Sequence, residues 1–381
     1  MNPNEKIRVL IVDDSAVMRH LIMNALLRHN DIEVVGTAAN GFLALEAINK
    51  SDPDIVTLDV EMPKMDGIEA LKEIRKIRPL IPVIMFGTLT QRGAKVTIDA
   101  LTSGASDYVG KPSDVHDLDA AYTVLESELI PKIRSLCAFK NKSTILSSLR
   151  IDSSTHLNQD KPKPFETSQQ SGAITQFKED LPPLLHRNIE RVDAIVIGVS
   201  TGGPGALMTL FSALKTPLKV PIFIVQHMPP KFTELLAKRL SDVCSTQISE
   251  AKEGKEAISE EAFIAPGGFH LYLKRSGEKV TMHLNEGPPE NSCRPSVDVL
   301  FRSAAQVYGK HILSVVLTGM GSDGLKGVQE IVGYGGSVII QDQETSVVWG
   351  MPGAIAAAHL ENKILPLDKI ADELMLMTQI R

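Results

Sequence analysis

The stretch AIVIGVSTGGPGAL, residues 194–207, decides the fold of the second half of the chain. It passes from an apolar run of strand length, through a glycine-rich turn, into the start of a helix. The same alternation of short apolar runs with amphipathic stretches extends over most of the 381 residues. Such alternation predicts βα units and parallel sheets. We therefore expect an α/β protein made of two doubly wound parallel-sheet domains.

A segment of different composition separates the two α/β regions. Residues 138–190 are rich in Ser, Thr, Gln, Asn, Lys and Pro, which is typical of a linker. We accordingly predict one domain at 1–137 and a second at 191–381. The strands expected in the first domain are IRVLIVDD, DIEVVGTA, DIVTLDV, PVIMFG and DYVGKP. Those expected in the second, after AIVIGV, are PIFIVQ, AFIAP, HLYLK, VTMHL, ILSVVLTG and SVIIQD.

Composition excludes several classes of function. The formal net charge of −6 argues against a nucleic-acid partner, since such domains usually carry a basic patch. No apolar run reaches the roughly 18 residues that span a bilayer, and the N-terminus lacks a signal-peptide pattern. The three cysteines, Cys137, Cys244 and Cys293, lack metal-ligand spacing, and such a sparse set fits a reducing compartment. We expect a cytoplasmic protein that does not insert into membranes.

Carboxylates follow two of the predicted strands in the first domain. Asp13 and Asp14 come directly after the apolar run ending at Val12, and Asp59 follows the run IVTL. Neighbouring parallel strands end at one edge of a sheet, so the three carboxylates should lie together. Such a cluster is unfavourable without a cation, and its oxygen ligands suit Mg²⁺. Lys111, at the end of the fifth predicted strand, supplies a positive charge at the same edge.

The set DD, LDVEMPKMDG and GKP resembles the site of response-regulator receiver domains, which have a flavodoxin-like fold. The resemblance implies that Asp59 accepts a phosphoryl group and that Asp13, Asp14 and Asp59 hold Mg²⁺. It also implies that the Glu61 carbonyl completes the metal site and that Lys111 contacts the phosphoryl group. A carboxylate can act as such a nucleophile, and cations stabilise the transferred group.

One position departs from the receiver pattern. Receivers usually carry Ser or Thr directly after the fourth strand, whereas IMFGTLT places Gly87 there and Thr88 one residue later. Either Thr88 contacts the phosphoryl group through a local backbone shift, or the coupling is weaker than usual. Tyr108 matches the aromatic switch position of the family, and a half-buried core tyrosine is an equally good interpretation.

In the second domain, Ser200 lies in the turn of the opening stretch, within G-x-S-x-G. A serine at such a strand-to-helix turn is exposed beside helix-terminal N–H groups, as a nucleophile requires. The same turn could instead hold a nucleotide phosphate. However, this turn lacks both the G-x-G-x-x-G pattern and a P-loop lysine, so the nucleotide interpretation is the less favoured of the two.

Two further strand ends complete a candidate triad. His227 follows PIFIVQ, and Asp323 lies in the glycine-rich loop after ILSVVLTG. Ser200, His227 and Asp323 would serve as nucleophile, general base and orienting acid. Among the other histidines, His270 and His283 fall in a probable hairpin, at surface or strand positions, and His311 has no glycine-rich loop beside it.

The segments GVSTGGP, QHMP, CRPSVDVLFRSAA, LTGMGSDG and VVWGMPGAI resemble the Rossmann-like catalytic domain of chemotaxis protein-glutamate methylesterases, the CheB family. The resemblance assigns the same three triad residues. Cys293 stands where the family commonly has His, and Gly353 where MP is often followed by Arg. We expect neither position to touch the triad.

The resemblance implies a phosphorylation-activated enzyme that hydrolyses γ-methyl esters of chemoreceptor glutamates and deamidates certain receptor glutamines. A histidine kinase would donate the phosphoryl group, and the resting receiver would cover the catalytic cleft. Two alternatives stay open on sequence alone: a non-enzymatic adaptor that binds receptors or kinase, and a hydrolase that acts on another ester.

Overall fold

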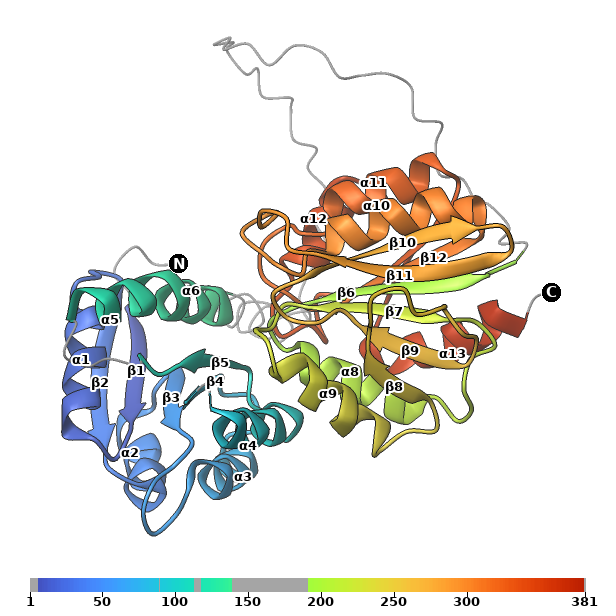
Figure 1. Ribbon diagram of the computed structural model, residues 1–381. Helices are drawn as coiled ribbons and strands as arrows, with labels where there is room; N and C mark the ends of the chain where they lie inside the picture. The colour runs from blue at the N-terminus through green and yellow to red at the C-terminus, as the bar shows by residue number, and fades with distance from the viewer. Residues whose placement is uncertain (1–5, 89, 113–117, 139–190, 380–381) are drawn as a thin grey trace, which may run out of the picture.

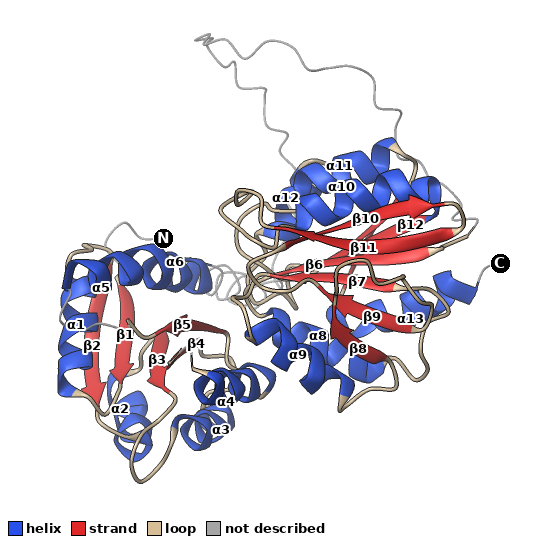
Figure 2. Ribbon diagram, viewed as in Figure 1, coloured by secondary structure: helices blue, strands red, loops and turns tan. Residues whose placement is uncertain are grey.

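The computed structural model describes residues 6–88, 90–112, 118–138 and 191–379 (Figure 1). The predicted linker, apart from Ala138, lies outside the described residues. On either side of it stands a parallel sheet covered by helices on both faces (Figure 2), which confirms the expected fold class.

The N-terminal sheet has five parallel strands in the order β2-β1-β3-β4-β5. This order places the ends of β1 and β3 side by side, with Val12 paired to Leu58. All five strands fall where the sequence predicts them. Their bounds are β1 (Ile7–Val12), β2 (Ile32–Ala38), β3 (Ile55–Asp59), β4 (Val83–Gly87) and β5 (Asp107–Gly110).

Helices cover both faces of this sheet because its strands are apolar on both sides. One face packs against α2 (Gly41–Ser51), α3 (Gly67–Ile77) and α4 (Gln91–Thr102). The other face packs against α1 (Ala16–Leu27) and the long helix that ends the N-terminal domain. That helix consists of α5 (Leu118–Val124), a π-helical turn (Leu125–Leu129) and α6 (Ile130–Ala138).

The C-terminal sheet has seven parallel strands in the order β14-β13-β12-β6-β7-β9-β8. The short edge strands β8 and β14 escaped prediction because they lack a long apolar run. An antiparallel hairpin, β10 (His270–Ser276) with β11 (Lys279–Asn285), confirms the predicted hairpin. The seven strands are β6 (Ala194–Val199), β7 (Ile222–Gln226), β8 (Gln247–Glu250), β9 (Glu261–Ile264), β12 (Ile312–Val316), β13 (Ser337–Gln341) and β14 (Lys363–Leu365).

Strand β6 is central and buried along its whole length, which explains its continuous apolar run. One face of its sheet carries α8 (Gly203–Ala213), α9 (Phe232–Ser241) and α13 (Leu367–Gln379). The opposite face carries the hairpin together with α10 (Val297–Tyr308), α11 (Leu325–Gly333) and α12 (Met351–Ala357).

The two domains touch through α4, which lies against α8 and α9 (Figure 1). An ion pair crosses this contact, with Arg239 Nε 3.6 Å from Asp99 Oδ1. Because α8 is the helix that follows β6 and α9 the helix that follows β7, the contact lies next to the candidate catalytic edge.

Candidate functional site

The acidic cluster forms at the carboxyl ends of β1 and β3, as predicted. Asp13 and Asp59 are buried, Asp14 is exposed, and a carboxylate oxygen from each lies within 4.8 Å of those of the others. Lys111 Nζ lies 2.7 Å from Asp59 Oδ2 and 3.0 Å from Asp13 Oδ2. The structure therefore brings together the four residues on which a phosphoacceptor site would depend.

The electrostatics of this cluster favour a cation. Burial and the nearby Asp13 carboxylate raise the pKa of Asp59 to about 6, although the Lys111 ammonium opposes the shift. One ammonium thus does not compensate for two buried carboxylates. An oxygen-only donor set with excess negative charge suits a hard divalent ion such as Mg²⁺.

A side chain from helix α4 occupies the space beside Gly87. A Cβ on Gly87 would come 2.7 Å from Thr97 Oγ1, which projects from α4, and 3.3 Å from a Val60 methyl group. Thr97 is buried, and its hydroxyl has no hydrogen-bond partner among the described residues. Thr88, in contrast, is exposed, and its hydroxyl lies 3.1 Å from that of Thr90. A hydroxyl therefore adjoins Gly87, but it belongs to Thr97.

Ser200 is partly exposed at the turn between β6 and α8. Its N–H donates to the Thr318 carbonyl, and its own carbonyl accepts from Gln226 Nε2 and the Gly203 N–H. The turn requires glycine at 202, where φ is +77° and a Cβ would come 2.6 Å from the Val347 side chain. Backbone bonds thus fix the serine at the carboxyl edge of the sheet.

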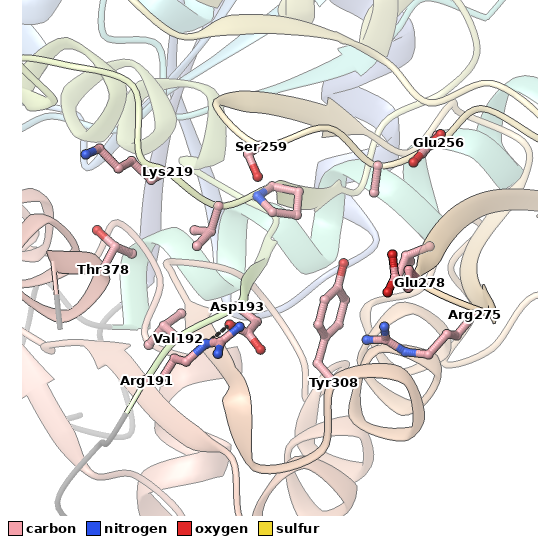
Figure 3. A pocket seen from close by; sticks show the side chains of 14 residues that line it. Arg191, Val192, Asp193, Lys219, Glu256, Ser259, Arg275, Glu278, Tyr308 and Thr378 are labelled. Atoms are coloured by element: carbon pink, nitrogen blue, oxygen red, sulfur yellow. Dashed lines mark hydrogen bonds and ion pairs between the residues drawn. The ribbon is translucent and has the colours of Figure 1, made fainter. Parts of the chain in front are cut away.

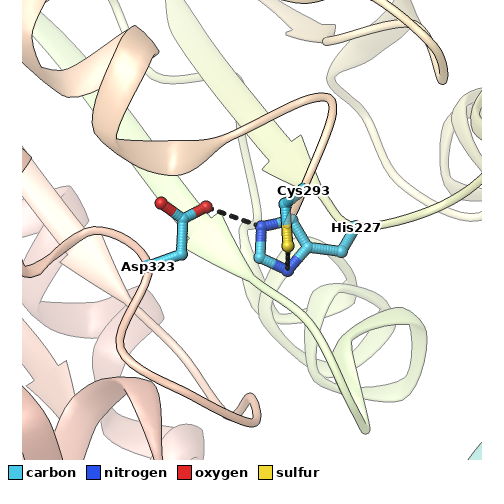
Figure 4. A group of neighbouring side chains, drawn as sticks. All are labelled: His227, Cys293 and Asp323. Atoms are coloured by element: carbon cyan, nitrogen blue, oxygen red, sulfur yellow. Dashed lines mark hydrogen bonds and ion pairs between the residues drawn. The ribbon is translucent and has the colours of Figure 1, made fainter. Parts of the chain in front are cut away.

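His227 follows β7, the neighbour of β6, and the register pairs Val199 with Gln226. Ser200 and His227 are therefore the first residues beyond two adjacent strand ends. The Ser200 hydroxyl makes no hydrogen bond to any residue that the structure describes. The imidazole is hydrogen bonded to Asp323, with 2.8 Å between Nε2 and Oδ2 (Figure 4).

The Asp323 carboxylate is held by the first turn of α10. Oδ2 accepts from the Val297 N–H at 2.7 Å, and Oδ1 accepts from the Asp298 N–H at 3.2 Å. Asn291 Nδ2 and Ser296 Oγ also donate to Oδ1, at 2.7 and 2.8 Å. These supports were not identified from the sequence, although Ser296, Val297 and Asp298 belong to the motif that begins at Cys293 and Asn291 lies just before it.

These contacts set the charge states of the pair. Burial would raise the pKa of Asp323, but the hydrogen bonds from His227 and the α10 N-terminus lower it to about 2. Burial would likewise lower the pKa of His227, but its contacts with Asp323 and Cys293 raise it above its ordinary value. The pair therefore stabilises an imidazolium, the form that a base takes after accepting a proton.

Cys293 contacts the second nitrogen of the same imidazole. Its Sγ lies 3.6 Å from His227 Nδ1 (Figure 4), and it is also within 4.8 Å of an Asp323 carboxylate oxygen. The prediction that Cys293 does not touch the triad is therefore wrong. The loop from Glu290 to Pro295 brings the cysteine across in space, which its position in the chain does not reveal. Gly353 instead faces Trp349, and a Cβ there would come 3.0 Å from the indole ring.

The N-terminal domain reaches the residues next to Ser200. Thr201 Oγ1 donates to Asp107 Oδ2 at 2.6 Å, and the Gly202 N–H donates to the Ser106 carbonyl at 3.0 Å. The Tyr108 ring stacks on Phe232 of α9, with ring centroids 5.0 Å apart. Tyr108 is thus an interface residue, which neither interpretation of the sequence specified.

A cavity of about 550 Å³ opens near the amino ends of the strands of the C-terminal sheet, opposite the catalytic edge (Figure 3). Val192 and Asp193, just before β6, and Tyr308, at the end of α10, line it. None of the candidate triad residues lines this cavity, so it is separate from the catalytic edge. The helices that the structure describes include none long and apolar enough to cross a membrane.

Comparisons with known proteins match both domains. A family model described as CheB methylesterase matches residues 195–374, and one described as a response regulator receiver domain matches residues 9–123. A protein-glutamate methylesterase/protein-glutamine glutaminase of Trichodesmium erythraeum is 47% identical over 97% of this chain and 98% of its own. Its counterpart in a Nocardioides species is 45% identical over 97% of this chain and 94% of its own. The crystal structure of the Thermotoga maritima CheB methylesterase catalytic domain is 41% identical with a TM-score of 0.48, covering 49% of this chain and 98% of that chain.

Proposed function

The chain belongs to the CheB methylesterase family and carries a receiver domain, and on this premise we propose that it is a protein-glutamate methylesterase and protein-glutamine deamidase. Its substrates would be the γ-methyl esters and certain glutamines of chemoreceptors. The observation that carries the proposal is the His227–Asp323 pair, held beside Ser200 at adjacent strand ends.

The geometry supports a role for each residue of the proposed triad. Nε2 of His227 is engaged by Asp323, so Nδ1 would accept the Ser200 proton as Oγ attacks the ester carbonyl. The imidazolium then returns that proton to the departing methoxide, and methanol leaves an acyl-enzyme. Water, deprotonated by the same imidazole, releases the glutamate carboxylate and restores Ser200. A glutamine side chain follows the same path and releases ammonia.

Cys293 bears on which residue is the nucleophile. Its thiol lies 3.6 Å from Nδ1, the nitrogen that we assign to the Ser200 proton, so the cysteine is a second candidate nucleophile. We assign catalysis to Ser200, because the strand-to-helix turn directs it to the sheet edge. Ser200→Ala should lower methanol release by several orders of magnitude, because triad members act as a unit. If Cys293→Ala did so while Ser200→Ala did not, the nucleophile would be the cysteine.

The receiver would be the phosphoryl acceptor. We propose that Asp59 takes the phosphoryl group from a histidine kinase, with Lys111 beside it, and that Asp13, Asp14 and Asp59 hold Mg²⁺. The ion would neutralise charge on the transferred group. Thr97 replaces Thr88 as the hydroxyl that we associate with the switch, because Thr97 is buried against Gly87.

We further propose that the resting receiver restrains the catalytic edge. Support comes from the Asp107–Thr201 hydrogen bond, one residue from Ser200, and from the Tyr108–Phe232 stack. Phosphorylation would shift a two-state interface away from this contact. The proposed domain limits stay at 1–137 and 191–381, and the proposed location is the cytoplasm, where receptor helices and kinase meet the enzyme.

Methanol release from methylated receptor membranes, with and without a small-molecule phosphodonor, tests this function. We expect release that depends on Ser200 and increases with phosphodonor. Receptor binding without release would favour an adaptor. Release from other esters but not from receptors would favour a different hydrolase.

A further inference from the structure

The side chains of Cys293, His227 and Asp323 form a donor set of the kind that binds zinc. One sulfur, one imidazole nitrogen and one carboxylate oxygen all lie within 4.8 Å of one another (Figure 4). Thiolate and imidazole are the ligands that Zn²⁺ prefers, whereas the acidic cluster of the receiver offers only oxygen. The two clusters therefore suit different metals.

The spacing of the two softer ligands matches a shared zinc ion. Zn–S and Zn–N bonds of about 2.3 and about 2.0–2.1 Å, at a tetrahedral angle, place the two ligand atoms about 3.6 Å apart. Cys293 Sγ and His227 Nδ1 are 3.6 Å apart. The two atoms are therefore already spaced as two ligands of one zinc ion are. Because the sulfur also lies within 4.8 Å of an Asp323 carboxylate oxygen, the Cys293 side chain would have to rotate for an ion to bind the ring-plane lone pair of Nδ1.

Asp323 supports this arrangement by holding the imidazole, without binding the metal itself. Zinc-bound histidines usually donate their second ring N–H to a carboxylate, which fixes the ring and its tautomer. His227 Nε2 already makes that contact with Asp323, and donors from α10 and its preceding loop hold the carboxylate in place. With Nε2 donating to Asp323, Nδ1 is the nitrogen left to bind the ion.

We propose that Cys293 Sγ and His227 Nδ1 bind Zn²⁺, with Asp323 orienting the imidazole, and that this binding competes with hydrolysis. Binding releases the thiol proton of Cys293, and water would fill the remaining positions on the metal. The ion would occupy the nitrogen that receives the Ser200 proton. The metal site stands on the geometry alone, whereas the competition rests on the proposed function.

Metal titration of the full-length protein tests the site without relying on activity. We expect Co²⁺, used as a spectroscopic probe, to give a sulfur-to-metal charge-transfer band that added Zn²⁺ abolishes by displacement. Cys293→Ser should remove the band and weaken Zn²⁺ binding by at least about 100-fold, since losing even an outer partner costs about 10- to 100-fold. Asp323→Asn should weaken it by about 10- to 100-fold.

Two controls separate this site from other ligands. Cys244 is also a free, partly exposed thiol, and Cys244→Ser should leave the band unchanged. Asp59→Asn should leave it unchanged as well, because the receiver cluster contains no sulfur. A band that persists in Cys293→Ser, or the absence of any band in the unmodified protein, would overturn the proposal.

Activity then distinguishes the metal site from the proposed function. Saturating Zn²⁺ should lower methanol release more than about 100-fold, because the base is lost, and a chelator should restore it. Cys293→Ser, compared with its own zinc-free rate, should resist this inhibition. Zinc binding without inhibition would support the metal site and overturn the assignment of His227 as the base.

Discussion

Thr201→Val tests whether the contact between the domains restrains the enzyme. The substitution keeps the branched shape of the side chain but removes the hydroxyl that donates to Asp107 Oδ2. Asp107 Oδ1 keeps its bonds to Lys132 Nζ and the Tyr108 N–H, so the receiver side of the interface stays anchored. The change is therefore confined to the contact one residue from Ser200.

The size of the effect follows from the kind of bond that is lost. Thr201 is buried, and a hydrogen bond to a charged group contributes about 1.5–3 kcal/mol. That amount shifts the ratio of closed to open protein by about 10- to 150-fold. We therefore expect the unphosphorylated variant to release methanol faster, up to the rate of the phosphorylated protein as a ceiling.

Initial rates of methanol release from receptor membranes, with and without phosphodonor, provide the assay. Thr201→Ser keeps the hydroxyl and is the matched control, so its two rates should match those of the unmodified protein. If Thr201→Val lowered both rates equally, the residue would act in catalysis itself. If neither rate changed, the Asp107–Thr201 contact would not restrain the enzyme, and the reasoning would be refuted.

Three further predictions concern the switch. Asp59→Asn should abolish activation by phosphodonor and, in the presence of a chelator, raise the thermal midpoint of unfolding. The midpoint should rise because a pKa raised from 3.8 to about 6 means that the folded state disfavours the ionised carboxylate at neutral pH. Calorimetry measures the midpoint and acid-labile phosphate measures phosphorylation, and a variant that is still phosphorylated would show that the acceptor lies elsewhere. A fragment starting at Arg191 should fold and exceed the resting full-length protein in methanol release; equal rates would point to activation by targeting instead. Gly87→Ser should increase the activation ratio only together with Thr97→Ala, since the new Cβ would otherwise lie 2.7 Å from Thr97 Oγ1; an increase in the single variant would show that Thr97 moves aside.

Regular structure was predictable wherever burial imposes a pattern. Strands such as β6 are covered on both faces, so their sequences are continuously apolar and easily recognised. Strands β8 and β14 lie at the edges, where exposure permits polar residues, and the sequence gives no comparable signal.

The candidate site was predictable where a residue follows a strand directly. Asp13 and His227 do so, Asp59 is the last residue of β3, and parallel strands bring such positions to one edge. Cys293 lies in an irregular loop instead, and only the folded path of that loop places its sulfur on the imidazole. Thr97 was missed for a related reason, because its position beside Gly87 depends on how closely α4 packs on β4.

The carboxylate of Asp323 links chemistry to the architecture of the catalytic domain. It is hydrogen bonded to His227, the proposed base, and it is also the negative charge at the N-terminus of α10, where unpaired N–H groups need an acceptor. Asparagine could satisfy only some of these donors, because its amide nitrogen would face an N–H or the imidazole. A substitution at this position therefore perturbs the start of a helix and the base together. Turnover lost on such a substitution has two origins, and only a parallel measurement of folding can separate them.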